Sequence, residues 1–154
     1  MVEKRTLTMI VLATIVWAVI ATGSAAYYYL AFQDLVNAIG GAPVRVDVLL
    51  DYGNGTRKWP HNGTVLFANS TVLDALLSVT KNVKYDVYPY GVLITEINGV
   101  KNVGNTTAGM AWMWYYWDWE KGTWTWGPEA CDKYVLGRLG THAIILWNYT
   151  SYSW

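Results

Sequence analysis

Residues 43–56 have the sequence PVRVDVLLDYGNGT, which combines a strand pattern with a turn pattern. Apolar side chains occupy every second position from Val44 to Leu50, and this period of two is typical of a strand that is buried on one face. The stretch from Asp51 to Thr56 is rich in the glycine and asparagine that tight turns require. We therefore expect a β-hairpin whose second strand returns through Trp59.

The chain after this hairpin predicts one short helix and further strands. Ser70 is a favourable N-cap for a helix over Thr71–Leu77, and Asp74 would lie in its first turn, where negative charge is stabilising. The apolar stripe expected to face the core comprises Val72, Leu73, Leu76, Leu77 and Val79. The expected strands are Val65–Phe67, Tyr85–Tyr90, Gly91–Ile97, Ala111–Trp119 and Ala143–Tyr149, with a tight turn at Asn98-Gly99. Strands that precede and follow a single helix in the sequence predict an α+β domain, with the helix on one face of a mixed or antiparallel sheet.

Five segments of this domain, taken in order, resemble a known family. They are residues 46–56 (VDVLLDYGNGT), 70–77 (STVLDALL), 90–100 (YGVLITEINGV), 112–116 (WMWYY) and 145–149 (ILWNY). Together they resemble the transcobalamin-like C-terminal domain, a β-grasp-type fold that also occurs alone in prokaryotic surface proteins. The resemblance covers Pro43–Tyr149 and implies a β-grasp-like fold for a domain that we place at residues 43–154.

The chain departs from the family pattern in two places. Tyr116-Trp117-Asp118 stands where the family usually has Val-Asn-Gly, and Gly140 is followed by Thr141 where the family usually has Asp. In transcobalamins a corrinoid lies between this domain and a large helical barrel, for which these 154 residues leave no room. A corrinoid is therefore implied by the resemblance alone, and the residues themselves predict no cofactor.

The N-terminal segment has the length and composition of a membrane-spanning helix. No charged residue occurs between Arg5 and Asp34, and about 20 apolar residues are enough to cross the hydrocarbon core of a bilayer. Lys4 and Arg5 favour a cytoplasmic N-terminus, because basic residues that flank a span tend to stay inside. We therefore expect a stem helix and linker over residues 1–42, with a single span that holds residues 43–154 outside the cell membrane.

Two alternatives to an anchor fit the same segment. Ser24-Ala25-Ala26 resembles a small-residue cleavage site, so the segment could be a signal peptide that is removed. A cut after Arg5 would instead leave a pilin-like stem of the kind that packs into surface filaments. Only the anchor retains residues 6–30 within a membrane.

The aromatic content is high, with 10 Trp and 12 Tyr residues, and six of the tryptophans fall within residues 112–126. On a strand, Trp112 and Trp114 point to one face, and Trp117 and Trp119 point to the other. One helix can cover only one face, so the second would expose more aromatic area than a monomer normally leaves in water. The candidate ligand-binding residues are therefore Trp112, Trp114, Trp117, Trp119, Trp124, Trp126 and Tyr90. The alternative is a tryptophan-rich core.

Five Asn-x-Ser/Thr sequences are candidate N-glycosylation sites, at Asn54, Asn62, Asn69, Asn105 and Asn148. All five follow the predicted span, and most lie in or beside predicted turns, where a bulky glycan stays in solvent. We expect a glycoprotein. The alternative is that these sequences only reflect a turn-rich composition.

The other polar residues provide no convincing catalytic or metal site. Asp118 and Glu120 would lie on one strand face, about 7 Å apart, where solvated charges are the usual outcome and a glycosidase pair or a calcium site is the alternative. His61 and His142 lack ligand-spaced partners, and the single Cys131 excludes an intrachain disulfide. The 11 basic and 11 acidic residues cancel, which argues against a nucleic-acid partner.

These observations predict a membrane-anchored extracytoplasmic binding module without enzymatic activity, cofactor or metal. The aromatic strand region would bind a ligand or a protein partner, and the membrane is the second expected partner. The alternative is a structural role, either as a subunit of a surface filament that self-assembles through its stem or as an accessory subunit of a membrane complex.

Overall fold

The structure of the chain is a computed structural model that describes residues 2–38, 40–60 and 63–153. It divides into two units between Ile39 and Gly40. The boundary that the sequence suggests, after residue 42, lies in the short segment between this division and the first strand.

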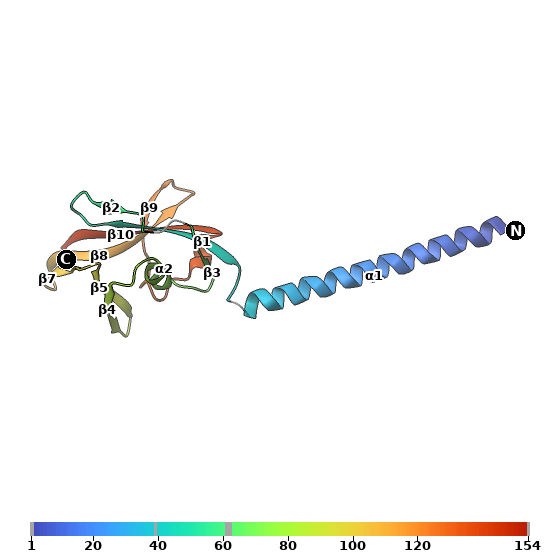
Figure 1. Cartoon of the computed structure of the whole chain (residues 1–154), viewed down its shortest axis with the longest axis horizontal. Helices are drawn as coiled ribbons and strands as arrows, with labels where there is room; N and C mark the ends of the chain where they lie inside the picture. Colours follow the sequence, from blue (N-terminus) through green and yellow to red (C-terminus); the bar gives the residue numbers. More distant parts are fainter. Residues whose placement is uncertain (1, 39, 61–62, 154) are drawn as a thin grey trace. The chain divides into compact units, whose positions relative to one another are not determined.

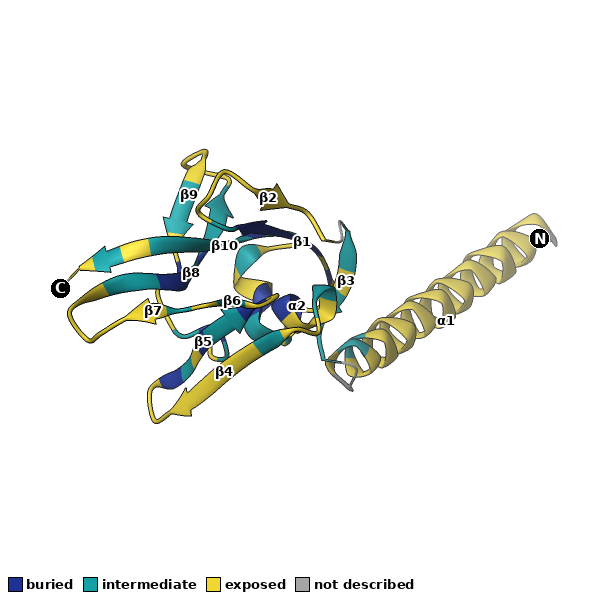
Figure 2. Ribbon diagram, turned by 60° about the vertical axis from the view of Figure 1, so that its left-hand side comes forward, coloured by how far each residue is buried: buried dark blue, intermediate teal, exposed yellow. Residues whose placement is uncertain are grey.

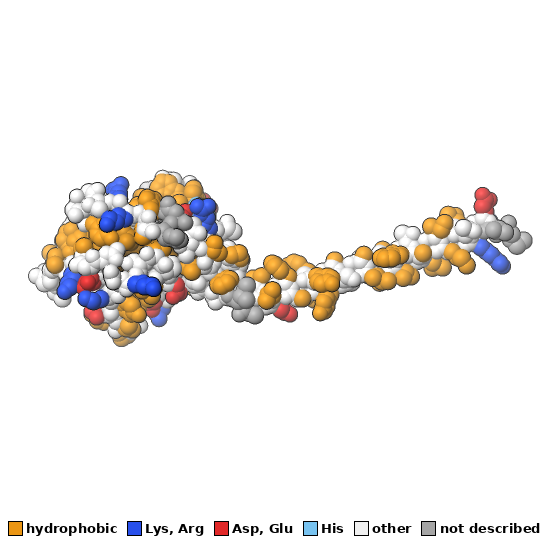
Figure 3. Space-filling model, in the orientation of Figure 1, with side chains coloured by type: hydrophobic (Ala, Val, Ile, Leu, Met, Phe, Trp, Pro, Cys, Tyr) orange, Lys and Arg blue, Asp and Glu red, His pale blue; other side chains and the backbone are white. Residues whose placement is uncertain are grey.

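The first unit is one helix, α1 (Val2–Ala38), of 37 residues. A helix of this length is roughly 55 Å long, whereas the hydrocarbon core of a bilayer is about 30 Å thick. Apolar side chains occur along all of it, and charged ones lie only near its ends (Figure 3). Thr8 and Thr14 donate their hydroxyls to carbonyl oxygens one turn earlier, which satisfies these polar groups within an apolar segment. The expectation of a helix long and apolar enough to span a membrane is confirmed, because an 18-residue stretch within Glu3–Asn37 has a mean hydropathy of 2.1.

The second unit is built around a seven-stranded sheet with the strand order β2–β1–β10–β8–β7, in which β3 also pairs with β1 and β9 with β8 (Figure 1). These strands are β1 (Pro43–Asp51), β2 (Arg57–Lys58), β3 (Thr64–Phe67), β7 (Val103–Gly104), β8 (Ala108–Asp118), β9 (Thr123–Trp126) and β10 (His142–Ser153). β1 and β10 run parallel, and the other pairs are antiparallel. The last strand of the chain therefore lies at the centre of the sheet, beside the first strand of the domain.

A second layer covers one face of this sheet. It contains α2 (Val72–Val79), the 3₁₀ helix η1 (Leu136–Leu139) and a three-stranded sheet of β4 (Val83–Tyr88), β5 (Gly91–Ile97) and β6 (Val100–Lys101). Figure 2 shows α2 and the small sheet on the same side of the large sheet. β5 and β6 are joined at Asn98 and Gly99, whose positive φ angles of 50° and 86° are those of the tight turn that the sequence predicts.

The core fills the space between the two layers. Its largest buried side chains include Val46, Val48, Leu50, Leu76, Ile94, Ile97, Trp112, Ile145 and Trp147. Val44 and the other alternating apolar residues of β1 all point into this core, as the period of two predicts. The expected α+β class, with an apolar N-terminal helix ahead of the sheets, is confirmed by this arrangement.

The start of α2 differs from the sequence prediction by one residue. The N-cap is Thr71 rather than Ser70. The Thr71 hydroxyl accepts a hydrogen bond from the Asp74 N–H at 3.2 Å, and the Asp74 carboxylate accepts one from the Thr71 N–H at 2.7 Å. This reciprocal capping box satisfies two backbone donors at once, which Ser70 could not do from its position.

Two apolar side chains lie elsewhere than the sequence predicts. Leu77 is 38% exposed, and Ala75 takes the buried position instead, because the stripe of α2 that faces the core follows the spacing i, i+3, i+4 from Val72. β2 ends at Lys58, so Trp59 lies beyond the strand and is 47% exposed.

Candidate binding site

The predicted ligand-binding tryptophans divide between the two faces of the large sheet. Trp112 and Trp114 point into the core and are 2% and 7% exposed. Their indole N–H groups donate to the carbonyl oxygens of Val100 and Glu129 at 2.9 and 3.0 Å. A buried indole whose N–H is satisfied by the backbone stabilises the fold. The expectation of an open binding surface is therefore corrected for these two residues, which are core.

The opposite face of the sheet carries an aromatic row. The row comprises Tyr115, Trp117 and Trp119 at the end of β8, and Trp124 and Trp126 of β9. The Trp117 ring meets those of Trp119 and Trp124 edge-on, with centroids 6.4 and 5.4 Å apart, and such contacts are favourable between aromatic rings. Trp119 and Trp126 nevertheless remain 58% and 50% exposed. The rings of this row therefore pack against one another, and their outer side is exposed to solvent.

A hollow of about 330 Å³, the aromatic hollow, lies beside this row. It is lined by Leu49, Asp51, Arg57, Tyr115, Trp124, Leu146 and Asn148. The two leucines and the two rings form its apolar part, and the three remaining side chains form its polar part. Burial raises the pKa of Tyr115 above the usual 10.0, so its hydroxyl stays protonated at neutral pH and can donate a hydrogen bond.

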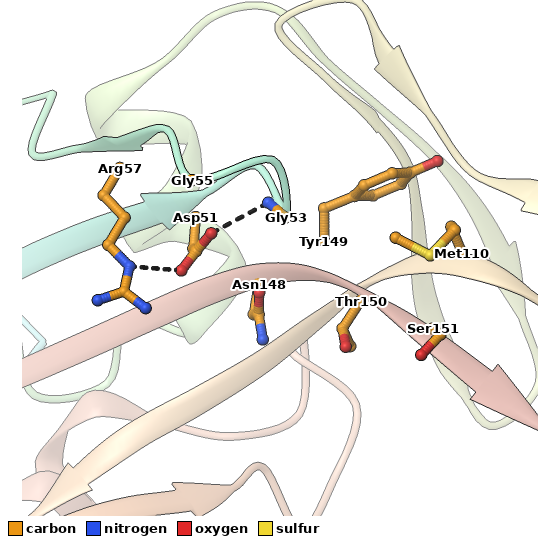
Figure 4. A pocket seen from close by; sticks show the side chains of 9 residues that line it. All are labelled: Asp51, Gly53, Gly55, Arg57, Met110, Asn148, Tyr149, Thr150 and Ser151. Carbon is orange, nitrogen blue, oxygen red and sulfur yellow. Dashed lines mark hydrogen bonds and ion pairs between the residues drawn. The ribbon is translucent and has the colours of Figure 1, made fainter.

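A second hollow of about 530 Å³, the polar hollow, is drawn in Figure 4. It adjoins the first, because Asp51, Arg57 and Asn148 line both. Its other lining residues are Gly53, Gly55, Met110, Tyr149, Thr150 and Ser151. The Asp51 carboxylate accepts hydrogen bonds from the Gly53 N–H at 3.0 Å and from Arg57 Nε at 2.6 Å. This ion pair neutralises both side chains, so the polar hollow offers hydrogen-bonding groups without a net charge.

The strand pairing explains why these polar groups meet. In the parallel pair Asp51 lies opposite Asn148 and Leu49 lies opposite Leu146, while β2 places Arg57 opposite Asp51. Residues that lie opposite each other on neighbouring strands share a face. The Asn148 amide forms no hydrogen bond to any other residue in the described ranges, so its donors and its acceptor are available to a ligand.

The loop between β1 and β2 forms the rim of the polar hollow. A side chain at Gly53, whose φ is +71°, would place its Cβ 2.3 Å from the Tyr149 carbonyl oxygen. Only glycine therefore lets the loop approach β10 this closely. Beyond Asn148, the described part of β10 pairs with β8 and with no other described strand, so its other edge faces the hollow.

A carboxylate–histidine pair at the other end of β1 was not predicted from the sequence, where its members are 95 residues apart. His142 Nε2 lies 2.7 Å from Asp47 Oδ2, and the His142 ring lies 5.8 Å from that of Trp119. Burial disfavours the charged form of Asp47, but hydrogen bonds from His142 and Gly63 and the charge of Arg45 outweigh it and hold the pKa of Asp47 below the usual 3.8. The groups that contact this pair are the Gly63 N–H, Arg45 and the Trp119 ring.

Asp118, one of the two residues weighed for catalysis or calcium binding, and two acidic residues after β9, Glu129 and Asp132, each have a separate partner. The pairs are Asp118–Lys121 at 2.9 Å, Glu129–Arg138 at 2.7 Å and Asp132 with the Val92 N–H at 2.7 Å. Burial raises the pKa of Cys131 to about 12, so its thiol stays protonated and unreactive at neutral pH. Within the residues that the structure describes, no group of three His, Cys, Asp or Glu side chains could hold a metal ion.

The candidate glycosylation sites differ in their surroundings. Asn54, Asn69 and Asn105 are exposed. Asn148 is half-buried within β10 and lines both hollows, so a glycan attached there would fill them. Asn62 and the nearby His61 lie outside the described residues.

Tyr90 lies apart from both hollows, at a cleft of about 420 Å³ next to β5 and the segment after β9. Its ring stacks on that of Tyr88 with centroids 5.2 Å apart, and its side chain is 71% exposed. The two core tryptophans of β8 also line this cleft, as do Trp126 and Trp147. The buried indole N–H of Trp147 has no hydrogen-bond partner among the described residues.

Comparison with known proteins finds a weak structural similarity. No protein-family model and no curated protein matches the chain. Among solved structures, the crystal structure of a provisionally assigned metal binding protein from Ruminococcus gnavus is similar, with a TM-score of 0.45 and 14% sequence identity over 70% of this chain and 98% of that one. A likeness of this degree carries neither family nor function to the present chain.

Proposed function

We propose that the chain is a membrane-anchored binding module whose folded domain works outside the cell, without enzymatic activity, through the open face of its large sheet. One observation carries this proposal: the aromatic row lies beside the aromatic hollow on the face that the second layer does not cover, and the polar hollow adjoins it at the edge of β10. Two of its tryptophans are half or more exposed. Monomeric proteins rarely leave such an apolar patch in water unless it binds something.

The anchor in this proposal rests on α1, which is apolar along its length and preceded by Lys4 and Arg5. A signal sequence would have a similar composition, so the mature N-terminus decides between the two. Native protein should stay in the membrane pellet after an alkaline carbonate wash and should retain residues 6–30. An N-terminal sequence that begins at Tyr27 would contradict the anchor. Filaments in electron micrographs of lipid-free full-length protein would favour the structural alternative instead.

The fold-level part of the proposal is a β-grasp-type domain related to the transcobalamin-like C-terminal domain. It is supported by the five motif segments and by a mixed sheet, with a central parallel pair β1–β10, that packs α2 on one face. An experimental structure of the chain should superpose on such a domain from β1 to β10 in the same strand order. A different strand order in the superposition would reject the relationship.

Binding through the open face is testable in native membranes. A photo-crosslinking amino acid in place of Trp126 or Trp119 should join the chain to a component of the cell envelope. The matched control is the same amino acid in place of Val87, which is 74% exposed on β4 in the other layer. Equal crosslinking at all three positions, or none at the two tryptophans, would count against a binding function for the open face.

A further inference from the structure

We propose that the joined aromatic and polar hollows bind a neutral oligosaccharide along β10. One sugar ring would stack on Trp124 and Tyr115, and hydroxyl groups would bond to the polar side chains that the two hollows share. This inference rests on the proposed function, because it names the ligand class for the same open face.

The apolar part of the aromatic hollow suits the flat face of a sugar ring. A pyranose presents C–H groups on its ring faces and hydroxyl groups around its rim. The hollow has the same division, with Trp124, Tyr115 and the leucines on one side and polar groups on the other. Tryptophan and tyrosine add a polar atom at one ring edge, which lets the same side chain contact both the C–H face and a hydroxyl.

The polar part supplies both kinds of hydrogen-bonding group. Asn148 offers a free amide, which donates and accepts, as a sugar hydroxyl also does. Asp51 uses its two oxygens on Gly53 and Arg57 and keeps lone pairs on each. Arg57 uses only its Nε–H within the described residues, so four N–H donors of its guanidinium remain.

The charge and size of the site select among ligands. Asp51 and Arg57 neutralise each other, and among the described residues no other charged side chain lines either hollow. A charged ligand would therefore lack an ionic partner, whereas a neutral polyol needs none. The volumes of about 330 and 530 Å³ are those of small-molecule sites. Because the two hollows adjoin at Asn148, an elongated ligand of a few sugar units can occupy both.

The test uses the full chain in lipid nanodiscs, free of detergents with sugar headgroups that would compete for the site. It is screened on an array of neutral oligosaccharides that includes cellohexaose, maltohexaose and mannohexaose, with hexagalacturonate as an acidic comparison. Binding of a neutral member is then titrated by tryptophan fluorescence. Trp124→Ala and Asn148→Asp should each raise Kd at least tenfold. Trp59→Ala, which removes an exposed ring that lines neither hollow and is not part of the aromatic row, should change Kd less than twofold.

Asn148→Asp keeps the shape of the side chain, so it tests the hydrogen bonds even if Trp124→Ala folds poorly. The absence of binding to every neutral oligosaccharide on the array would overturn the proposal, as would equal losses for Trp124→Ala and Trp59→Ala. A glycan found on Asn148 of the native protein would also overturn it, because that glycan would occupy the hollows. Open-face crosslinks to a protein without saccharide binding would reject the ligand class and keep the proposed function, whereas failure of both experiments would reject both.

Discussion

The two faces of the seven-stranded sheet use the same type of side chain in different ways. On the covered face, Trp112 and Trp114 are buried and their N–H groups are satisfied by backbone carbonyl oxygens. On the open face, the rings of Trp117 and Trp124 meet edge-on and remain partly accessible. Neighbouring residues of one strand thus serve the core and a candidate binding surface, which shows that a count of tryptophans says little about their role.

The difference comes from what each face packs against. The covered face is in contact with α2 and β5, so most of its apolar side chains are buried. The second layer does not cover the open face, which mixes rings with the Asp51–Arg57 and Asp47–His142 pairs. Substitutions on the covered face should therefore lower the free energy of unfolding, and substitutions on the open face should mainly weaken binding.

The largest expected effect is on the covered face. Trp112→Ala should lower the free energy of unfolding by about 3–5 kcal/mol, because it leaves a cavity in the core and an unpaired carbonyl oxygen at Val100. Chemical denaturation followed by near-ultraviolet circular dichroism measures this loss. A loss below about 1 kcal/mol would mean that Trp112 is not a core residue and would break the comparison.

A smaller effect is expected in the loop that forms the rim of the polar hollow. Gly53→Ala should cost at least about 2 kcal/mol of unfolding free energy, since it combines backbone strain with a clash against the Tyr149 carbonyl oxygen. Gly55→Ala is the matched control, because its φ is also positive, at +86°, but nothing lies within 4 Å of the added carbon. Only the strain of about 1 kcal/mol should appear there. Equal losses in denaturation experiments would show that the loop does not press on β10.

The Asp47–His142 pair should contribute to a loss of folding stability at low pH. The pKa of Asp47 is lower in the folded chain than its usual 3.8, so its ionised form stabilises the fold above that pH. This contribution is lost as the pH falls through the folded-state pKa. Asp47→Asn should therefore flatten the fall in stability below about pH 4.

Asp118 and Asp132 also have lowered pKa values, so some acid sensitivity will remain in that variant. Urea denaturation of both chains at neutral pH and in acid makes the comparison. Parallel acid profiles for the two would show that the pair contributes nothing on this face.

The smallest effect is expected at the exposed end of the aromatic row. Trp119→Ala removes a side chain that is 58% exposed and loses one hydrogen bond of 3.3 Å to the His142 carbonyl oxygen. The cost should be about 1 kcal/mol or less, and the thermal midpoint should move by only a few degrees. A loss as large as that of Trp112→Ala would place Trp119 in a core and would remove the basis for an open face.

Several elements could be predicted because they depend on near neighbours in the chain. The long uncharged run before Asp34 defines α1, and the alternating valines define β1. The cap of α2 was misplaced because Ser70 and Thr71 are both good N-caps, and only Thr71 has an acidic residue three positions later. Leu77 was expected in the core because a short helix leaves the angle of its apolar stripe poorly defined.

The candidate site depended on contacts that the sequence could not supply. The sequence predicts a strand and a glycosylation site at Asn148 and a turn that begins at Asp51, but no binding role for either residue. No local pattern signals that they lie side by side, because this follows from the parallel pairing of β1 with β10. The same pairing brings His142 to Asp47.

The sequence by itself determined the apolar helix and which side chains of each strand share a face. These properties depend on helix length and on the period of two along a strand, and both are local. Only the tertiary structure decided which face of the sheet α2 covers, and therefore which tryptophans are core and which border the hollows. The physical reason is that the side chains of a strand alternate between its two faces in the same way whichever face is buried. The choice is made by long-range contacts between elements that lie far apart in the chain.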